Sequence, residues 1–269
     1  MNAVRTVAKE LWTSIPLINR LAVYETKIKN KSNYLGSFWE IISPLLFIAI
    51  YWFAFGYGIR QRSDVDGIPF LTWMLAGIIL WFFIQPGVTN GSKAIFSKIK
   101  MISKMNFPTS IIPAYVVISR LFPHLALLAI TIVYMQFAGH PVSVYYLQIP
   151  YFLVAAILLV ISVVMITSTL TVIVRDFQVF IQSSIRVFLY LTPILWPMDN
   201  RLPDWLIPVM KINPMYYLVE GYRASFFYGE WYFITNASYT LYFWALVFVL
   251  FSIGAVLHVR FRRHFVDFL

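Results

Sequence analysis

The sequence predicts an all-α membrane protein with six transmembrane helices. Of the 269 residues, 60% are hydrophobic and 12% are charged, and the mean hydropathy is +0.75, a composition that soluble domains do not have. Apolar stretches recur at the length of about 20 residues that a helix needs to cross a bilayer. The chain has no cysteine, which excludes disulfides, thiolate metal sites and cysteine catalysis.

Six stretches have the composition of membrane spans. The third and fourth belong to one apolar region that is too long for a single helix. It divides at Gly139, His140 and Pro141, because glycine and proline interrupt helices. The predicted spans cover residues 41–59, 69–89, 113–138, 147–174, 177–196 and 231–259.

The distribution of basic residues predicts the orientation of these spans. The formal net charge is +10, and lysine and arginine gather in the N-terminal segment, in the loop after the second span, at Arg175 and in the C-terminal tail. Six spans put all of these on one side. The positive-inside rule therefore places both termini in the cytoplasm. An alternative with five spans leaves Arg260, Arg262 and Arg263 outside, which the rule disfavours.

Residues 3–15 predict an amphipathic helix that does not cross the membrane. Apolar side chains such as Val4 and Leu11 recur at helical spacing, with Arg5 and Lys9 on the other side. This pattern is typical of a helix lying in the cytoplasmic interface. The alternative is an N-terminal helix packed on protein.

The loop at 91–107 has a similar pattern. Ile95, Ile99 and Ile102 recur at intervals of three and four residues, lysines share another face, and Ser92 precedes them as a possible N-cap. The pattern predicts a short basic helix parallel to the membrane. Its lysines bind lipid headgroups in one interpretation, and the helix docks a cytoplasmic partner in the other.

The segment at 192–232 contains five prolines and apolar runs that are too short to cross a membrane. We expect re-entrant or interfacial pieces on the outer side, which are tolerated at membrane depth only when buried in protein or lining a wet cavity. The alternative is a folded aromatic cap resting at the headgroups.

The sequence contains little chemistry of its own. It has no G-x-x-x-x-G-K-[ST] loop for ATP, and Asp64 and Asp66 are more typical of a solvated turn than of a metal site. Three charges lie within or next to predicted spans: Glu40, Arg120 and Arg186. Because unpaired charges in a membrane are costly, we expect both arginines to face the bundle interior or a water-filled path. The alternatives are a structural ion pair of Glu40 with one of the arginines, an arginine that reaches the interface by its long stem, and attraction of an anionic substrate.

Several segments match motifs of a known family. YETK lies at 24–27, NYLGSFWEIISPL at 33–45 and IYWFAFG at 50–56. RDF follows at 175–177, TPILWP at 192–197 and KINPMYYLVEGYR at 211–223. Over essentially its whole length, the chain resembles the permeases of type-2 ATP-binding-cassette exporters of cell-surface polysaccharides. The form of the first motifs is most similar to the branch that exports wall teichoic acid from Gram-positive bacteria.

The resemblance implies a homodimer that works with two copies of a separate ATPase subunit, which binds ATP and Mg²⁺. This chain is then a transport subunit and not an enzyme, with no catalytic residue, metal or cofactor of its own and no nucleic acid partner. Residues 92–105 map onto the family's cytoplasmic coupling helix, and 175–177 onto a second contact. The expected ATPase-coupling residues are Lys98, Ile99, Ile102, Arg175, Asp176 and Phe177.

The transported molecule implied by the resemblance is a lipid-linked anionic polyol-phosphate polymer, wall teichoic acid, which moves from the cytoplasm to the cell surface. Lysine attracts such a polymer, and aromatic faces pack on its apolar surfaces. The alternatives are a lipid-linked O-antigen or capsule, a small-molecule drug, or passive conduction through a channel. The expected residues where substrate enters are Tyr24, Lys27, Lys29 and Lys31, and the path candidates are Glu40, Trp81, Phe82, Phe83, Arg120, Arg186, Tyr190 and Trp196.

The predicted organisation has three parts: a cytoplasmic interfacial region at 1–34, a six-span permease domain at 35–260 and a cytoplasmic tail at 261–269. Within the permease domain, 91–107 is the expected coupling helix and 197–232 the expected extracellular re-entrant region. The expected location is the plasma membrane of a Gram-positive bacterium, in contact with membrane lipids.

Overall fold

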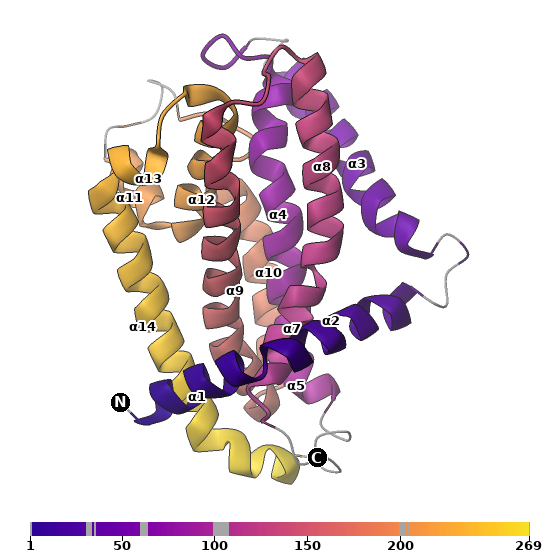
Figure 1. Cartoon of the computed structure of the whole chain (residues 1–269), viewed down its shortest axis with the longest axis vertical. Coiled ribbons are helices and arrows are strands. Elements are labelled where there is room, and N and C mark those ends of the chain that lie inside the picture. Colours follow the sequence, from indigo (N-terminus) through magenta and orange to yellow (C-terminus); the bar gives the residue numbers. More distant parts are fainter. Residues whose placement is uncertain are drawn as a thin grey trace.

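The computed structural model describes residues 2–30, 34, 36–59, 64–98, 108–198, 203 and 205–268. Within these ranges the chain is almost entirely helical, and Val65 and Ile68 form one isolated bridge between extended residues. Several long helices run side by side along the long axis of the molecule (Figure 1). The predicted class, a polytopic all-α membrane protein, is confirmed.

Among the described residues, five helices are long and apolar enough to cross a membrane. They match the first, second, third, fourth and sixth predicted spans. Their segments are α3 (Trp39–Tyr51) continued by η2 (Trp52–Ile59), α4 (Phe70–Ser92), α7 (Ile111–Ser119) with α8 (Leu121–Phe137), η3 (Val144–Leu147) with α9 (Gln148–Ile173), and α14 (Ala237–Phe261) with η5 (Arg262–Phe268).

Two predicted boundaries differ from the structure by five or six residues. The fifth span was expected to reach residue 196, but α10 (Phe177–Leu191) has 15 residues, about 22 Å at the α-helical rise. It ends because Pro193 disfavours helical backbone at the preceding residue, and Thr192 is extended with ψ 132°. The sixth span was expected to begin at 231, but α13 (Tyr232–Thr235) is a separate turn before α14.

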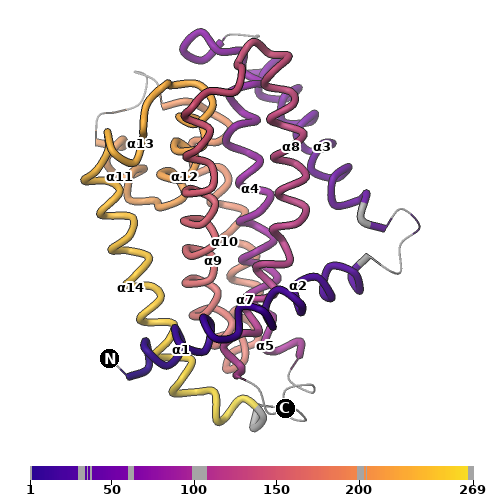
Figure 2. Tube along the Cα trace, viewed as in Figure 1, coloured from indigo at the N-terminus to yellow at the C-terminus, as the bar shows by residue number. Residues whose placement is uncertain are grey.

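Two helices cross one end of the bundle, which we call the basal end. α1 (Asn2–Thr13) and α2 (Ile15–Asn30) run transverse to α9 and α14 (Figure 2). The predicted amphipathic helix is present: Val7 is buried, whereas Arg5 and Lys9 are exposed. α1 contacts α14, so it packs on protein through this buried side. Trp12 and Ile15 remain 77% and 42% exposed, and the location of α1 in the membrane interface stays a prediction.

α4 forms the centre of the bundle. It contacts α7, α8, α9, α10 and α12, and its residues are buried along most of their length. At Gly91, a Cβ atom would lie 2.6 Å from Val164 of α9. The absence of a side chain there lets the two helix backbones approach closely, as small residues do in membrane proteins.

The proline-rich segment forms short helices at the end opposite to the basal end. They are α11 (Leu206–Ile212), α12 (Pro214–Arg223), η4 (Ala224–Tyr228) and α13. Asn213 caps α12 by accepting from Met215 N at 3.0 Å, and Tyr217 and Tyr222 of α12 are fully buried. α12 is therefore enclosed in protein, the condition under which a short helix is tolerated at membrane depth.

Candidate functional site

A polar cavity opens where α2 ends and α3 begins. Its volume is about 350 Å³, and it combines charged side chains with aromatic and proline walls. We call it the Glu40 cavity. The lining residues are Lys29, Trp39, Glu40, Ser43, Pro44, Phe47, Phe82, Gln85, Pro86, Arg120 and Pro123.

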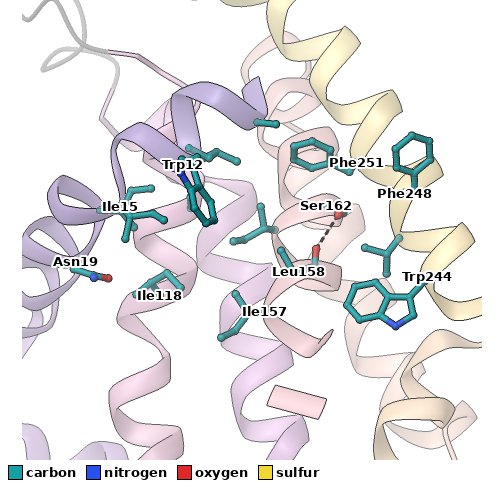
Figure 3. A pocket seen from close by; sticks show the side chains of 16 residues that line it. Trp12, Ile15, Asn19, Ile118, Ile157, Leu158, Ser162, Trp244, Phe248 and Phe251 are labelled. Atoms are coloured by element: carbon teal, nitrogen blue, oxygen red, sulfur yellow. Dashed lines mark hydrogen bonds between the residues drawn. The ribbon is translucent and has the colours of Figure 1, made fainter. Parts of the chain in front are cut away.

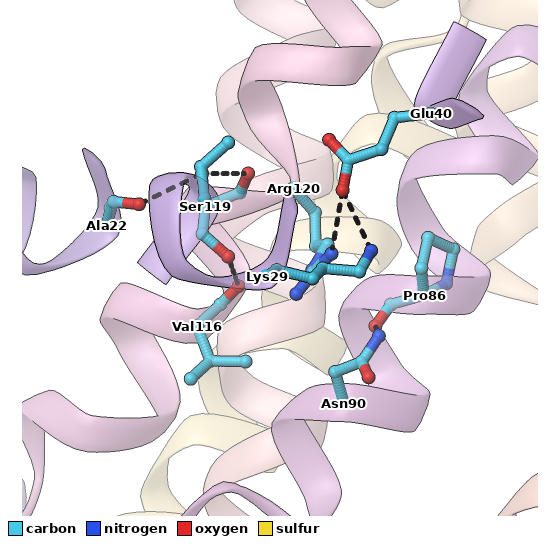
Figure 4. Close-up of polar contacts among 9 residues, drawn as sticks. Ala22, Lys29, Glu40, Pro86, Asn90, Val116, Ser119 and Arg120 are labelled. Atoms are coloured by element: carbon cyan, nitrogen blue, oxygen red, sulfur yellow. Dashed lines mark hydrogen bonds and ion pairs between the residues drawn. The ribbon is translucent and has the colours of Figure 1, made fainter. Parts of the chain in front are cut away.

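Glu40 contacts two cations in this cavity (Figure 4). Lys29 Nζ donates to Glu40 Oε1 at 2.8 Å, and Arg120 Nη1 lies 3.5 Å from the same oxygen. The Arg120 side chain is 7% exposed, and its Nε has no hydrogen-bond partner among the described residues. Arg120 therefore lies in the interior as expected, and of the alternatives for the two arginines the ion pair with Glu40 is present at Arg120.

A proline places Arg120 at this cavity. Pro123 has no N–H, so it cannot donate to the carbonyl of Ser119 as a helix requires. The helix breaks there: α7 ends at Ser119, α8 begins at Leu121, and Arg120 lies at the junction. Thr26 Oγ1 of α2 donates instead to Ser119 O at 3.3 Å. The same break therefore positions the arginine and docks α2.

The aromatic path candidates of α4 occupy different surroundings. Phe82 lines the Glu40 cavity. Trp81 and Phe83 are buried in the helical core, and the Phe83 ring packs 5.5 Å from that of His124. Within a single subunit, Phe82 therefore lines the Glu40 cavity, whereas Trp81 and Phe83 lie in the core.

Arg186 was expected to face the bundle interior or a water-filled path, and within the single subunit it does not face the interior. Ile185 and Leu189 of α10 are buried against the bundle, while Arg186 and Tyr190 are exposed. Because successive helical residues are separated by about 100°, burying Ile185 turns Arg186 outward. Trp196 Nε1 donates to Tyr190 O at 2.8 Å, so these two path candidates lie together at the end of α10.

The residues expected at the substrate entrance differ in their surroundings: some are exposed, and one forms an ion pair. Tyr24 is 62% exposed and Lys27 is also exposed. Lys29 is held by Glu40, and Lys31 lies outside the described residues. Of the predicted set, Lys29 is the residue that the fold brings to Glu40 and Arg120.

The described coupling residues gather at the basal end. Lys98, just after α5 (Ala94–Ser97), forms an ion pair with Glu25 of α2 and lies 4.8 Å from the ring centre of Tyr115. Burial lowers the pKa of Lys98, but its hydrogen bonds to Glu25 and Tyr115 outweigh burial and raise the pKa above its ordinary value. Lys98 thus links α5 to α2.

The second predicted coupling segment lies against the first. The guanidinium of Arg175 is 5.4 Å from the ring centre of Phe96 in α5, a cation–π contact. Asp176 is exposed and precedes α10 as its N-cap residue, and the Phe177 ring lies 5.6 Å from that of Phe180. The fold therefore brings α5 and residues 175–177 together as one surface, which we call the basal surface.

The predicted start of the coupling helix is wrong. Ser92 is the last residue of α4 rather than an N-cap, because α4 continues beyond the expected end at 89. Its hydroxyl donates to Gln178 Oε1 at 2.7 Å. Ile95 is fully buried, while Ile99 and Ile102 lie outside the described residues.

A larger groove of about 570 Å³ lies beside α1, between α7, α9 and α14 (Figure 3). Trp12, Ile118 and Phe248 are among its lining residues, which are apolar apart from a few polar atoms such as those of Asn19 and Ser162. The lining carries no lysine, arginine or acidic side chain. The groove therefore suits hydrocarbon, whereas the Glu40 cavity is suited to a charged group.

Sequence reasoning missed the most deeply buried arginine among the described residues. Arg223 was assigned to an outer loop, but its side chain is 1% exposed and Nη1 donates to Glu220 at 2.6 Å. Its guanidinium lies 3.5 Å from the ring centre of Trp73, and Nη2 donates to Ile194 O. The i,i+3 spacing of Glu220 and Arg223 could have predicted their ion pair. It could not have predicted the contact of Arg223 with Trp73.

Comparison with known proteins places these features in a family. Residues 17–227 match the family described as ABC-2 type transporter. An O-antigen export system permease protein of Klebsiella pneumoniae is 26% identical over 247 residues, which cover 91% of this chain and 92% of that protein. A protein of the same description from Myxococcus xanthus is 23% identical over 82% of this chain and 84% of its own length.

The matched residues include the Glu40 cavity, the basal surface and α12. They also cover well over half of the chain. The chain therefore belongs to the ABC-2 type transporter family.

Proposed function

We propose that this chain is the membrane subunit of an ATP-driven exporter that moves a lipid-linked surface polysaccharide out of the cytoplasm. The observation that carries the proposal is the similarity, over 91% of the chain, to a protein named as an O-antigen export permease. The Glu40 cavity supports it, because an amphipathic lipid-linked substrate needs both charged and apolar contacts.

The identity of the transported polymer is proposed on separate grounds. The named relatives favour an O-antigen-like polysaccharide, while the motifs at 33–45 and 50–56 are the reason to consider wall teichoic acid. We propose that either polymer is linked to a lipid carrier that contains phosphate, so the Glu40 cavity could bind the carrier of either one. A small-molecule drug exporter is the third candidate and needs no such carrier.

The proposed working form is a homodimer. The window of the first span has 11% of its residues buried within the subunit, and α10 exposes Arg186. A charge facing lipid from a membrane helix is costly, so a second copy or a wet path between copies is the better neighbour for this face. Tyr190 shares the face, which keeps it and Arg186 as path candidates.

The proposed energy source is a separate ABC ATPase subunit in two copies, which binds ATP and Mg²⁺ and docks at the basal surface. We place this end in the cytoplasm by the positive-inside rule, since Arg175 and the arginines that follow α14 lie there. Phe177 belongs to this surface and is partly exposed, so its ring is available to an apolar side chain of the partner.

The test is reconstitution with the ATPase subunit in lipid nanodiscs. The wild-type pair hydrolyses ATP faster than the ATPase alone, and Phe177→Asp abolishes this stimulation. Val142→Asp is the matched control and keeps the stimulation. Val142 is an exposed apolar residue in the connection between α8 and η3, and the connection that follows α8 lies at the end opposite to the basal end (Figure 1). Equal stimulation by both variants contradicts docking at the basal surface.

Inside-out vesicles then identify the substrate. We expect ATP-dependent uptake of a labelled lipid-linked polysaccharide, and comparison of a neutral O-antigen with a polyol-phosphate polymer decides between the two polymers. Uptake of a fluorescent drug-like cation with neither polymer moving would overturn the export proposal.

A further inference from the structure

We infer that Lys29 and Arg120 form a binding site for the phosphate groups of the substrate's lipid carrier, and that Glu40 occupies this site when no lipid is bound. The inference rests on the proposed export of a lipid-linked polymer. It assigns to the Glu40 cavity a chemical class of ligand, a polyprenyl phosphate or diphosphate, and to Glu40 the role of an internal competitor.

Arg120 is an incompletely satisfied anion receptor. Its side chain is buried to more than nine-tenths, its Nε has no hydrogen-bond partner among the described residues, and Nη1 lies 3.5 Å from Glu40. Charge-assisted hydrogen bonds normally measure about 2.7–2.9 Å, so the contact with Glu40 is loose. A guanidinium presents its donors as a planar fork that suits phosphate oxygens. Within the part of the chain that the structure describes, Nε is unpaired and Nη1 faces one distant carboxylate oxygen.

The described cations of the Glu40 cavity outnumber its carboxylates, which favours binding of a further anion. One oxygen of Glu40 serves both Lys29 and Arg120. Glu25, the other carboxylate whose charge acts on Arg120, is itself paired with Lys98. Two cations therefore share one carboxylate, and a phosphate, with more charge and more acceptor oxygens, compensates them better than Glu40 does.

The walls of the cavity match the remainder of such a lipid. Trp39, Phe47 and Phe82 provide apolar faces beside the charged groups, and Trp39 is 45% exposed. The Lys29 side chain is 47% exposed while that of Arg120 is 7% exposed. A ligand approaching along α2 therefore meets Lys29 first and Arg120 last, with its prenyl chain against the aromatic rings.

Substitutions of Lys29, Glu40 and Arg120 are expected to change lipid binding in opposite directions. If Glu40 competes with the ligand, Glu40→Gln strengthens binding, whereas Arg120→Gln and Lys29→Gln weaken it. If the cluster only holds the helices together, all three substitutions act through stability and none of them strengthens binding. The sign of the Glu40→Gln effect separates the two.

The experiment measures binding of a long-chain polyprenyl diphosphate to the full chain in nanodiscs of zwitterionic lipid, by native mass spectrometry. The uncharged polyprenol and inorganic pyrophosphate are the matched probes. We expect the diphosphate lipid to bind, Arg120→Gln to weaken it about tenfold and Glu40→Gln to strengthen it about threefold. Glu40→Asp, which keeps the charge, stays within about twofold of the wild type. Arg120→Lys keeps the charge and loses the fork, and we expect it to bind between the wild type and Arg120→Gln.

Three results overturn the inference: equal binding of polyprenol and diphosphate lipid, equal binding of inorganic pyrophosphate and diphosphate lipid, or weaker binding by Glu40→Gln. Thermal unfolding of each variant is measured in the same nanodiscs. If Arg120→Gln does not fold, Arg120→Lys and Glu40→Gln still decide the outcome. Binding is measured without the ATPase subunit, and export is measured separately in the inside-out vesicles. Lipid binding without export contradicts only the proposed function. Export without phosphate-dependent lipid binding contradicts only this inference.

Discussion

The guanidinium of Arg262 donates to the carboxylate of Glu10 at 2.8 Å, joining α1 to the segment that follows α14. Ser110 Oγ, just before α7, donates to the other oxygen of the same carboxylate at 2.6 Å. Glu10 thus ties the two ends of the chain to the basal end of the bundle.

Glu10→Ala removes both hydrogen bonds and leaves Ser110, which is fully buried, without this acceptor. We expect a loss of about 1–3 kcal/mol in the free energy of unfolding, together with faster proteolysis within α1. Thermal unfolding and limited proteolysis in detergent measure these effects. Lys9→Ala is the control, because the neighbouring Lys9 is exposed; equal effects of the two variants contradict the prediction.

Lys98→Met removes the charge that links α5 to Glu25. Because the pKa of Lys98 is raised on folding, its stabilising contribution is complete below the ordinary value of 10.5 and is lost as the pH rises through the raised value. We expect the wild type to unfold at a higher temperature than Lys98→Met at pH 7–10, and this difference to shrink at higher pH. Lys27→Met, at an exposed position, shows no such difference. A difference that disappears already below pH 9 would falsify the link.

Gly221→Ala tests the close packing of α12 on α9. A Cβ atom at Gly221 would lie 2.2 Å from Phe152 Cε1, in a fully buried contact. Overpacking of this kind costs about 1–3 kcal/mol or more, so we expect a clearly lower unfolding temperature that is partly restored by adding Phe152→Leu. The control is Gly58→Ala, because a Cβ at Gly58 meets no atom within 4 Å. An unfolding temperature unchanged by Gly221→Ala would refute the packing.

Arg223→Met tests the buried charge beside α4. The change removes the cation–π contact with Trp73 and leaves Glu220 without its ion-pair partner. Breaking a buried pair costs about 3–5 kcal/mol, and we expect a large part of it to be recovered in the double variant with Glu220→Gln. Unfolding of both variants in urea measures the coupling. Strictly additive effects of the two substitutions would show that the residues act independently.

The interior of the bundle was predictable where the length of an apolar stretch decides the structure. The second span was expected at 69–89 and is observed as Phe70–Ser92, and Arg120 was expected inside the protein. The division of the third and fourth spans near Gly139 also appears in the structure, where this glycine has φ +86°, a conformation that other residues avoid.

Arg186 and Arg223 show where sequence reasoning stopped. Both are arginines in apolar surroundings, but one is exposed and the other is fully buried. A local pattern does not contain this difference. It depends on which side of α10 packs on the bundle, and on Trp73, which lies 150 residues before Arg223 along the chain yet only 3.5 Å from it.

By itself, the sequence determined that the chain is a helical membrane protein, roughly where most spans lie, and the motifs that suggested its family. These properties follow from local composition, because a helix satisfies its own backbone hydrogen bonds and needs only sufficient apolar length to cross a bilayer. The tertiary structure decided that Lys29, Glu40 and Arg120 meet at one cavity and that α5 packs beside Arg175. Charges in an apolar medium are stabilised by their partners, and those partners come from distant segments that only the packing of helices brings together.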